Sequence, residues 1–227
     1  MASSVAFEFQ SQTLSGRGGP VSFPPHFYFK NVIKLALEGG DLQGLPREIV
    51  LKKKDAENES LFETEQRCYD KLHYLQGRLI PRYYGLASID GTPALVLSDV
   101  GGITMLNEGM PWLAESYLRE TLRKPLEEIR AAGVLLEDVS LTNMHYCGGG
   151  VFRVLDFELV KMDQSVDGPV VREDVDSQVE SLVDRYQERQ VAIRELQSFW
   201  KQHSAVDCWK SSQKNELLPR DVGGSAY

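Results

Sequence analysis

The stretch from Gly133 to Val160 constrains this chain more than any other part of its sequence. It reads GVLLEDVSLTNMHYCGGGVFRVLDFELV, in which Asp138 follows an apolar run, Asn143 comes five positions later, and three glycines precede a second apolar run ending at Asp156. The glycines predict a tight hairpin that fixes these polar residues on rigid elements. Phosphoryl transfer from a nucleotide needs a carboxylate beside the acceptor hydroxyl and oxygen ligands for Mg²⁺. This segment offers both.

Composition narrows the classes of partner and compartment. The 227 residues suffice for one substantial core or two small lobes, and the formal net charge of −8 disfavours nucleic acid and anionic membranes as partners. The three cysteines, Cys68, Cys147 and Cys208, lie far apart without a C-x-x-C pair, which suits a reducing compartment. The sequence shows neither a secretory signal pattern nor an apolar run of membrane-spanning length. We therefore expect a cytoplasmic or nuclear protein that is not secreted and does not bind membranes.

The first hundred residues are predicted to be mostly strands. The glycine- and proline-rich tract Ser15–Phe27 is predicted to be a loop. A helix is predicted over Glu57–Gln76, because apolar residues recur there at steps of three and four. The predicted strands form two antiparallel hairpins, the second turning at Asp90-Gly91, and cover Phe27–Gly40, Arg47–Lys53, Ile80–Ile89 and Pro93–Val100.

Beyond the helix-breaking pair Gly101-Gly102 the chain is predicted to be mainly helical. One amphipathic helix is expected over Leu113–Ile129, kinked at Pro125, and a second over Val175–Trp200. The polar tail after Cys208 is expected to be loose. Strands first and helices later indicate the α+β class, with two lobes covering residues 1–100 and 101–227.

The segment that contains Asp138 resembles the catalytic and metal loops of the protein-kinase-like superfamily. Asp138 matches the acid of the H-R-D-L-x-x-x-N motif, Asn143 matches its asparagine, and Asp156 matches the acid of D-F-G. Glu158 stands in place of the D-F-G glycine, as in the D-F-E and D-F-D forms of divergent members. The resemblance implies that Asp138 orients and deprotonates an acceptor hydroxyl, while Asn143 and Asp156 hold Mg²⁺.

Lys52 resembles the strand lysine of the V-A-I-K motif in the same superfamily. That role would place its ammonium on the α- and β-phosphates of ATP, with Glu65 as its helix partner and Glu63 as the second choice. In the alternative interpretation, Lys52, Lys53 and Lys54 form a solvated strand end, and Glu65 is a surface residue of the helix.

The run ALVLSDVGG resembles the segment that binds adenine through its backbone in this superfamily. The resemblance implies that Ser98 and Val100 supply the backbone groups, and that Leu97 lines the back of the pocket. Alternatively, the run is an ordinary buried strand followed by glycines.

Several family features are missing. There is no G-x-G-x-x-G loop, and the nearest glycines, Gly16, Gly18 and Gly19, lie far upstream of the lysine, so this tract is equally well interpreted as a flexible linker. Leu136 and Glu137 replace the motif histidine and arginine, and Glu137 would repel a phosphate on the following segment. No A-P-E motif follows the metal loop. These departures favour a compact enzyme over a conventional protein kinase.

The resemblance implies an α+β, two-lobed protein-kinase-like fold with a small antiparallel β lobe and a reduced helical lobe. It implies an ATP-dependent, Mg²⁺-dependent phosphotransferase acting on a hydroxyl of a protein or small molecule. A pseudokinase, which would bind or scaffold without turnover, is the alternative. A third possibility is an unrelated α+β domain, in which Asp138, Asn143 and Asp156 do not converge.

Overall fold

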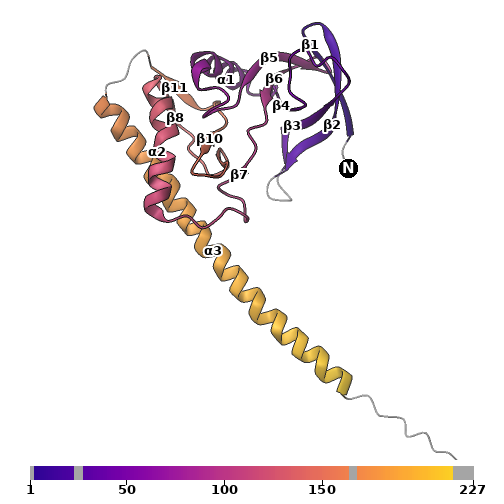
Figure 1. The fold of residues 1–227 in the computed structure, drawn as a ribbon, viewed down its shortest axis with the longest axis vertical. Helices are drawn as coiled ribbons and strands as arrows, with labels where there is room; N and C mark the ends of the chain where they lie inside the picture. The colour runs from indigo at the N-terminus through magenta and orange to yellow at the C-terminus, as the bar shows by residue number, and fades with distance from the viewer. Residues whose placement is uncertain (1–2, 23–27, 164–167, 217–227) are drawn as a thin grey trace, which may run out of the picture. The chain divides into compact units, whose positions relative to one another are not determined.

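The computed structural model describes residues 3–22, 28–163 and 168–216 (Figure 1). The chain divides into two compact units, Met1–Tyr186 and Gln187–Tyr227. The second unit contains the rest of helix α3 (Gly168–Glu216), which starts in the first unit. No helix in the described part of the chain has the length and apolar character needed to cross a membrane.

Six strands of the first unit close into an antiparallel barrel in the order β1-β2-β3-β4-β6-β5 (Figure 1). Their bounds are β1 (Ser3–Phe9), β2 (Gln12–Ser22), β3 (Tyr28–Glu38), β4 (Glu48–Lys53), β5 (Tyr83–Ile89) and β6 (Thr92–Ser98). The barrel closes where β1 pairs with β5, at Glu8↔Ser88 and Phe9↔Ala87. Alternate residues of the strands point inward, so Leu35 and Leu37 of β3 and Ile49 and Leu51 of β4 are all buried in one apolar core.

The closed barrel contradicts the predicted fold class, the two-lobed protein-kinase-like fold. The error began at the N-terminus, because no strand was predicted over Ser3–Phe9 and the tract Ser15–Phe27 was predicted to be a loop. The part of that tract up to Ser22 lies in β2, paired with β3, and residues 23–27 lie outside the described residues. Because β1 pairs with both β2 and β5, it turns an open sheet into a closed one.

Two glycines explain why this tract misled the prediction. A Cβ atom on Gly18 would lie 1.9 Å from the carbonyl oxygen of Lys34, and one on Gly16 would lie 2.9 Å from that of Ala36. The tight approach of β2 to β3 therefore requires residues without a side chain, since real Cβ atoms do not come so close to a backbone oxygen. In this part of the chain, glycine marks crowding between strands and not a turn.

Both predicted hairpins of the barrel are confirmed. Strands β3 and β4 are antiparallel, and strands β5 and β6 are joined by a turn in which Asp90 and Gly91 have φ angles of +50° and +78°. Two successive positive φ angles are typical of the hairpin turn that matches the twist of its strands. The predicted helix over Glu57–Gln76 is also present, as α1 (Glu59–Lys71) followed by a 3₁₀ turn (His73–Leu75).

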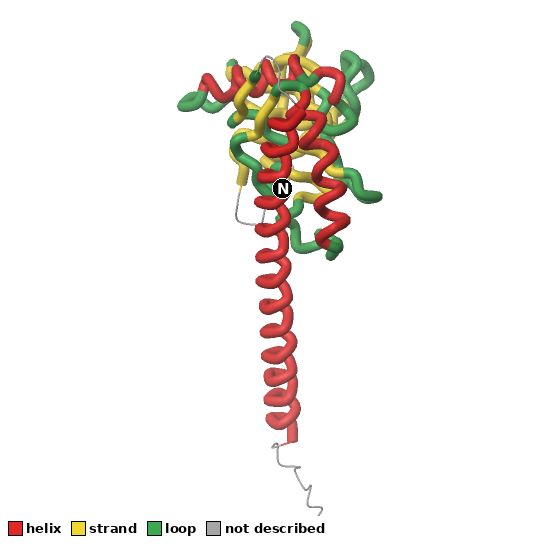
Figure 2. The backbone as a smooth tube through the Cα atoms, turned by 90° about the vertical axis from the view of Figure 1, so that its left-hand side faces the viewer, coloured by secondary structure: helices red, strands yellow, loops and turns green. Residues whose placement is uncertain are grey.

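The second half of the first unit carries helices and short strands. Helix α2 (Glu115–Ala131) runs through Pro125 and lies beside the first part of α3 in both ribbon views, where Arg123 pairs with Asp176 at 2.6 Å (Figure 2). Two small sheets have the orders β10-β9-β7 and β11-β8. Their strands are β7 (Ile103–Thr104), β8 (Val134–Leu136), β9 (Met144–Tyr146), β10 (Phe152–Val154) and β11 (Val160–Met162).

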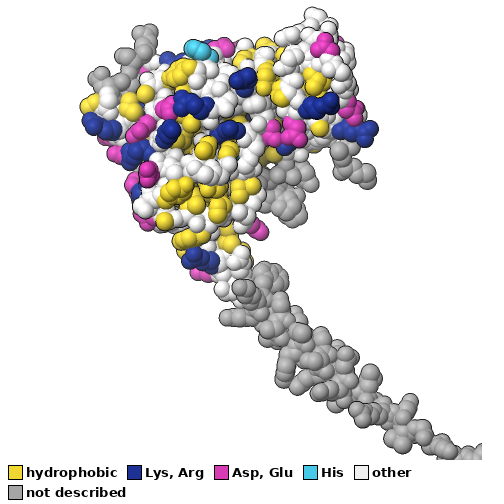
Figure 3. Space-filling model, viewed as in Figure 1, with side chains coloured by type: hydrophobic (Ala, Val, Ile, Leu, Met, Phe, Trp, Pro, Cys, Tyr) yellow, Lys and Arg dark blue, Asp and Glu magenta, His cyan; other side chains and the backbone are white. Residues whose placement is uncertain are grey.

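The strand–glycine–strand hairpin predicted around Gly148–Gly150 is confirmed as β9 and β10. By contrast, the expectation of a loose tail after Cys208 was wrong as far as Glu216, because α3 continues to that residue. Residues 217–227 lie outside the described part of the chain. On the face drawn in Figure 3, Lys and Arg side chains are interspersed with Asp and Glu, so this face carries no extended patch of one charge.

Candidate functional site

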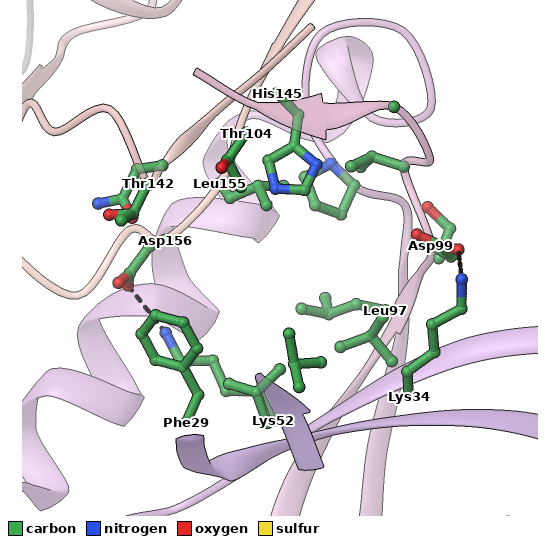
Figure 4. A pocket seen from close by; sticks show the side chains of 18 of the residues that line it. Phe29, Lys34, Lys52, Leu97, Asp99, Thr104, Thr142, His145, Leu155 and Asp156 are labelled. Carbon is green, nitrogen blue, oxygen red and sulfur yellow. Dashed lines mark hydrogen bonds and ion pairs between the residues drawn. The ribbon is translucent and has the colours of Figure 1, made fainter. Parts of the chain in front are cut away.

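A cavity of about 570 Å³ lies within the first unit, between the barrel and the β9–β10 hairpin (Figure 4). Its volume falls within the range of small-molecule sites. The apolar part of its lining includes Val32, Val50 and Leu97, and the polar part includes Lys52 and Asp156. The lining therefore combines an apolar surface with a few charged groups, as ligand sites do.

The Lys52 ammonium is the centre of the charged part of the cavity. Strand β4 carries Lys52, and its Nζ lies 2.7 Å from Glu65 Oε2, 2.8 Å from Asp156 Oδ1 and 2.9 Å from Glu158 Oε1. Figure 4 shows the contact between Lys52 and Asp156 at the edge of the cavity. Three segments that are distant in sequence thus meet at one ammonium group.

Glu65 reaches the cavity from the buried face of α1 and is only 1% exposed. Its Oε1 accepts a hydrogen bond of 3.4 Å from the Phe157 amide. Its Oε2 forms the ion pair with Lys52 but lacks the alignment of a hydrogen bond. Glu63, the second choice from the sequence, is exposed on the other face of α1. The structure therefore pairs Lys52 with Glu65.

The charges of this cluster do not balance. Burial raises the pKa of Glu65 to about 7, although the Lys52 charge opposes the shift. Burial acts to lower the pKa of Lys52, but Glu65, Asp156 and Glu158 together raise it above its ordinary value. The three carboxylates around one ammonium cause the shift of Lys52, whereas burial is the main cause of the shift of Glu65. The cluster therefore has an excess of negative charge and favours an additional cation.

The hairpin places Asn143 and Asp156 together at the cavity. The Leu155 amide donates to the Asn143 carbonyl at 2.8 Å, and the side chains of Asn143 and Asp156 both line the cavity. Asp156 has a φ of +63°, in the left-handed region, which Asp and Asn tolerate better than most residues. The Thr142 hydroxyl donates to Asn143 Oδ1 at 3.2 Å, which holds the amide in place.

Asp138 is the one predicted site residue that does not line the cavity. Its side chain is exposed, and it makes no hydrogen bond or ion pair with any described residue. The neighbouring Glu137 pairs with Lys161 at 2.6 Å. Asp138 is thus open to solvent at the end of β8, on the chain segment that leads to Asn143.

The predicted adenine segment lines the cavity with Leu97, Ser98 and Val100. The Ser98 amide donates to the Arg82 carbonyl at 2.8 Å, and the Val100 carbonyl accepts a hydrogen bond of 2.6 Å from Arg153. The Val100 amide makes no hydrogen bond with the described residues. The Val100 N–H is therefore left available to a ligand.

Three charged residues of the cavity were not assigned a role in binding from the sequence. Glu158 was recognised only as a departure from the D-F-G motif, yet it is the third carboxylate on Lys52. Lys34 Nζ and Asp99 Oδ2 lie 2.5 Å apart beside Leu97 (Figure 4). Burial acts to raise the pKa of Asp99, but the hydrogen bonds from Lys34 and the Gly101 amide lower it. No sequence motif predicts this pair, because its partners come from β3 and from the segment after β6.

The three glycines assigned from the sequence lie outside the cavity lining. Gly16, Gly18 and Gly19 lie in β2, and none of them lines it. The end of β2 and the start of β3 contribute Val21 and Phe29 instead. In the described part of the chain, the glycines of β2 therefore bring no backbone amide to the cavity.

The donor set suits a hard divalent cation. One carboxylate oxygen from each of Glu65, Asp156 and Glu158 lies within 4.8 Å of the others, and Asn143 lines the same cavity. Oxygen ligands with excess negative charge fit Mg²⁺ or Ca²⁺ better than metals that prefer nitrogen or sulfur. Asp156 and Glu158 are 39% and 34% exposed in their side chains, so an incoming ion can reach them.

Comparison with known proteins does not place the chain in a family. No protein-family model matches the sequence. No curated protein matches it either.

Proposed function

We propose that this chain is an ATP-dependent phosphotransferase, which moves the γ-phosphoryl group of Mg-ATP to a hydroxyl group on a protein or small molecule. One observation carries the proposal. The Lys52 ammonium lies inside a cavity of suitable size, 2.7 Å from the buried Glu65 and 2.8 Å from Asp156. A lysine held by a buried glutamate, next to an acid that can bind Mg²⁺, is what triphosphate binding requires. The proposal depends on this chemistry and not on the fold.

The remaining lining is compatible with a nucleotide. Val32, Val50 and Leu97 offer an apolar surface for the base, and the Val100 amide offers one hydrogen-bond donor. Lys52 would pair with the phosphates while Glu65 keeps its ammonium in position. Together these groups bind the two ends of a nucleotide by different interactions.

Asn143 and Asp156 are the residues that would hold Mg²⁺, because both offer side-chain oxygen to the same cavity. When bound, the ion neutralises part of the phosphate charge. The excess negative charge around Lys52 supports this role, since a triphosphate alone would be repelled by Asp156 and Glu158.

Asp138 is proposed as the base. In the transfer step the acceptor oxygen forms a bond to the γ-phosphorus, the bond from that phosphorus to the β-phosphate oxygen breaks, and ADP leaves. The proton of the acceptor hydroxyl passes to the Asp138 carboxylate. The exposure of Asp138 supports the assignment, because the base must be reached by an acceptor that arrives from solvent.

A binding module without turnover is the second candidate. Two observations favour it: Asp138 does not line the cavity, and neither do Gly16, Gly18 and Gly19, the glycines nearest to the missing phosphate loop. Such a module would use the same cavity and the same Lys52, but would release no ADP.

Binding of ATP measured by isothermal titration calorimetry, with and without Mg²⁺, tests the proposal. We expect Mg-dependent binding by the wild type, and a loss of at least about tenfold in affinity for Asp156→Asn, which keeps size and removes charge. Glu137→Gln is the matched control, because Glu137 pairs with Lys161 outside the cavity lining. Its affinity should equal that of the wild type.

Formation of ADP in the presence of a panel of hydroxyl acceptors separates the two candidates. Turnover supports the phosphotransferase, whereas tight Mg-ATP binding without turnover favours the binding module. The absence of any effect of ATP on the wild-type protein would reject both.

A further inference from the structure

The Glu158 carboxylate lies beside the Lys52 ammonium, where a nucleotide phosphate would have to approach it. A lysine ammonium has three N–H donors and no acceptor. Three carboxylates, from Glu65, Asp156 and Glu158, already lie 2.7 to 2.9 Å from Lys52 Nζ. Only the contact with Asp156 is a hydrogen bond, but the three carboxylate oxygens crowd the ammonium, so a phosphate oxygen gains room beside it when one carboxylate withdraws.

The burial of the three partners indicates which one withdraws. Glu65 is 1% exposed and is also bound to the Phe157 amide, so its release would leave a charge buried without a partner. Asp156 belongs to the strained left-handed turn, and its Oδ1 also accepts from the Glu158 amide at 3.4 Å. The Glu158 carboxylate makes the ion pair with Lys52 but no hydrogen bond with the described residues, and it is 34% exposed.

Glu158 also has the means to move. Its side chain has more rotatable bonds than that of Asp156, and the adjacent Phe157 is fully buried against Tyr69, which keeps the backbone fixed. The carboxylate can swing into solvent without disturbing the core. A glycine at this position would have no such group.

We propose that Glu158 is a built-in competitor of phosphate groups for Lys52, so that the site is self-inhibited until the Glu158 carboxylate is displaced. This inference rests on the proposed function, because the competing ligand is a nucleotide triphosphate. Glu158 holds the ammonium in the nucleotide-free protein and adds a negative charge where the phosphates must enter. Both effects weaken binding of ATP, most strongly when no divalent cation is present.

The test measures ATP affinity by calorimetry in EDTA for the wild type, Glu158→Gln and Glu158→Ala. Glutamine keeps the size and removes the charge, and alanine serves if the glutamine variant does not fold. We expect both to bind metal-free ATP at least about tenfold more tightly than the wild type, since an ion pair with Lys52 and a negative charge beside the phosphates are removed. Glu137→Gln, which removes an exposed carboxylate of the pair with Lys161, should leave the affinity unchanged.

A second measurement does not depend on nucleotide binding. Lys52 is labelled with a small amine-reactive reagent and followed by mass spectrometry. Loss of the Glu158 contact should speed its labelling relative to the wild type, because one face of the ammonium is freed. Unchanged labelling of Lys52 in both Glu158 variants would refute the inference.

The outcomes also separate this inference from the proposed function. If the wild type binds Mg-ATP but the Glu158 variants show no gain in EDTA, the competitor role is refuted alone. If no variant binds nucleotide with or without Mg²⁺, the proposed function is refuted and the inference falls with it. A gain in both Glu158 variants, absent from Glu137→Gln, supports the inference.

Discussion

Lys52 of β4 and Glu65 of α1 form an ion pair at 2.7 Å, and Glu65 is almost fully buried. Replacing Lys52 with Met should abolish detectable Mg-ATP binding, because the phosphates lose the ammonium beside Glu65 and Asp156. It should also lower the free energy of unfolding by about 3 kcal/mol, since a buried carboxylate loses its partner. Urea unfolding and calorimetry measure the two effects.

The double variant Lys52→Met/Glu65→Met separates these two effects. A buried ion pair replaced by apolar residues of similar volume costs little stability. We therefore expect it to be more stable than Lys52→Met while still failing to bind nucleotide. Recovery of nucleotide binding in the double variant would contradict the role assigned to Lys52.

Asp138→Asn should separate chemistry from binding. Asp138 is exposed and lies outside the cavity lining, so affinity for Mg-ATP should stay at the wild-type value. Turnover should fall by about 10²–10⁴-fold, the usual contribution of a general base. The rate of ADP formation and a parallel binding titration provide the comparison. A variant that turns over like the wild type would exclude Asp138 as the base.

Gly18 and Gly19 offer a matched pair for the barrel. A Cβ on Gly18 would overlap the Lys34 carbonyl at 1.9 Å, whereas one on Gly19 would meet nothing within 4 Å. Gly18→Ala should therefore lower the free energy of unfolding by about 1–3 kcal/mol. Gly19→Ala should change it by no more than about 0.5 kcal/mol. Urea denaturation of both variants tests the pair, and equal effects would contradict the tight approach of β2 to β3.

Cys68 should be inert in the folded protein. Burial raises the pKa of its thiol to about 12, and the nearby Glu65 charge adds to the shift. In the unfolded chain the thiol ionises near its ordinary value of 9.0, so stability should decline as the pH rises above that value. This part of the decline should be missing in Cys68→Ala. Unfolding curves between pH 8 and pH 10 provide the measurement.

The same thiol can be followed by labelling. In a Cys208→Ser background, a thiol reagent at pH 8 should modify the half-buried Cys147 first and reach Cys68 only on unfolding. Rapid modification of Cys68 in the folded protein would show that α1 opens more readily than its packing suggests.

The sequence allowed the local parts of the fold to be predicted, but not its closure. The β5–β6 hairpin was predictable because the alternation of its strands and the turn at Asp90-Gly91 are adjacent in sequence. The barrel was not, because it depends on Phe9 pairing with Ala87, which no local pattern encodes. The glycines of β2 added to the error. Glycine is needed where two strands lie very close together, and it is also common in flexible loops, so its presence alone does not tell these two cases apart.

For the site, motif spacing led to Lys52, Glu65 and Asp156, and their side chains meet. Spacing had no means of showing that Asp138 is exposed outside the cavity, since that depends on how β8 ends. Nor did it show that Arg153 occupies the Val100 carbonyl, because that contact comes from a side-chain conformation on another strand. Membership of the protein-kinase-like superfamily stays a prediction.

The φ of +63° at Asp156 has a consequence for how this position can vary. Alanine at this position would cost about 1–2 kcal/mol, because its Cβ atom is crowded in the left-handed conformation, and this cost is independent of charge. Asparagine and glycine adopt the conformation at a much lower cost. Relatives that have abandoned the carboxylate would therefore be expected to carry Asn or Gly at this position. The effect of replacing Asp156 with alanine would therefore overestimate the electrostatic contribution of its carboxylate, because it also includes the steric cost of the left-handed backbone conformation.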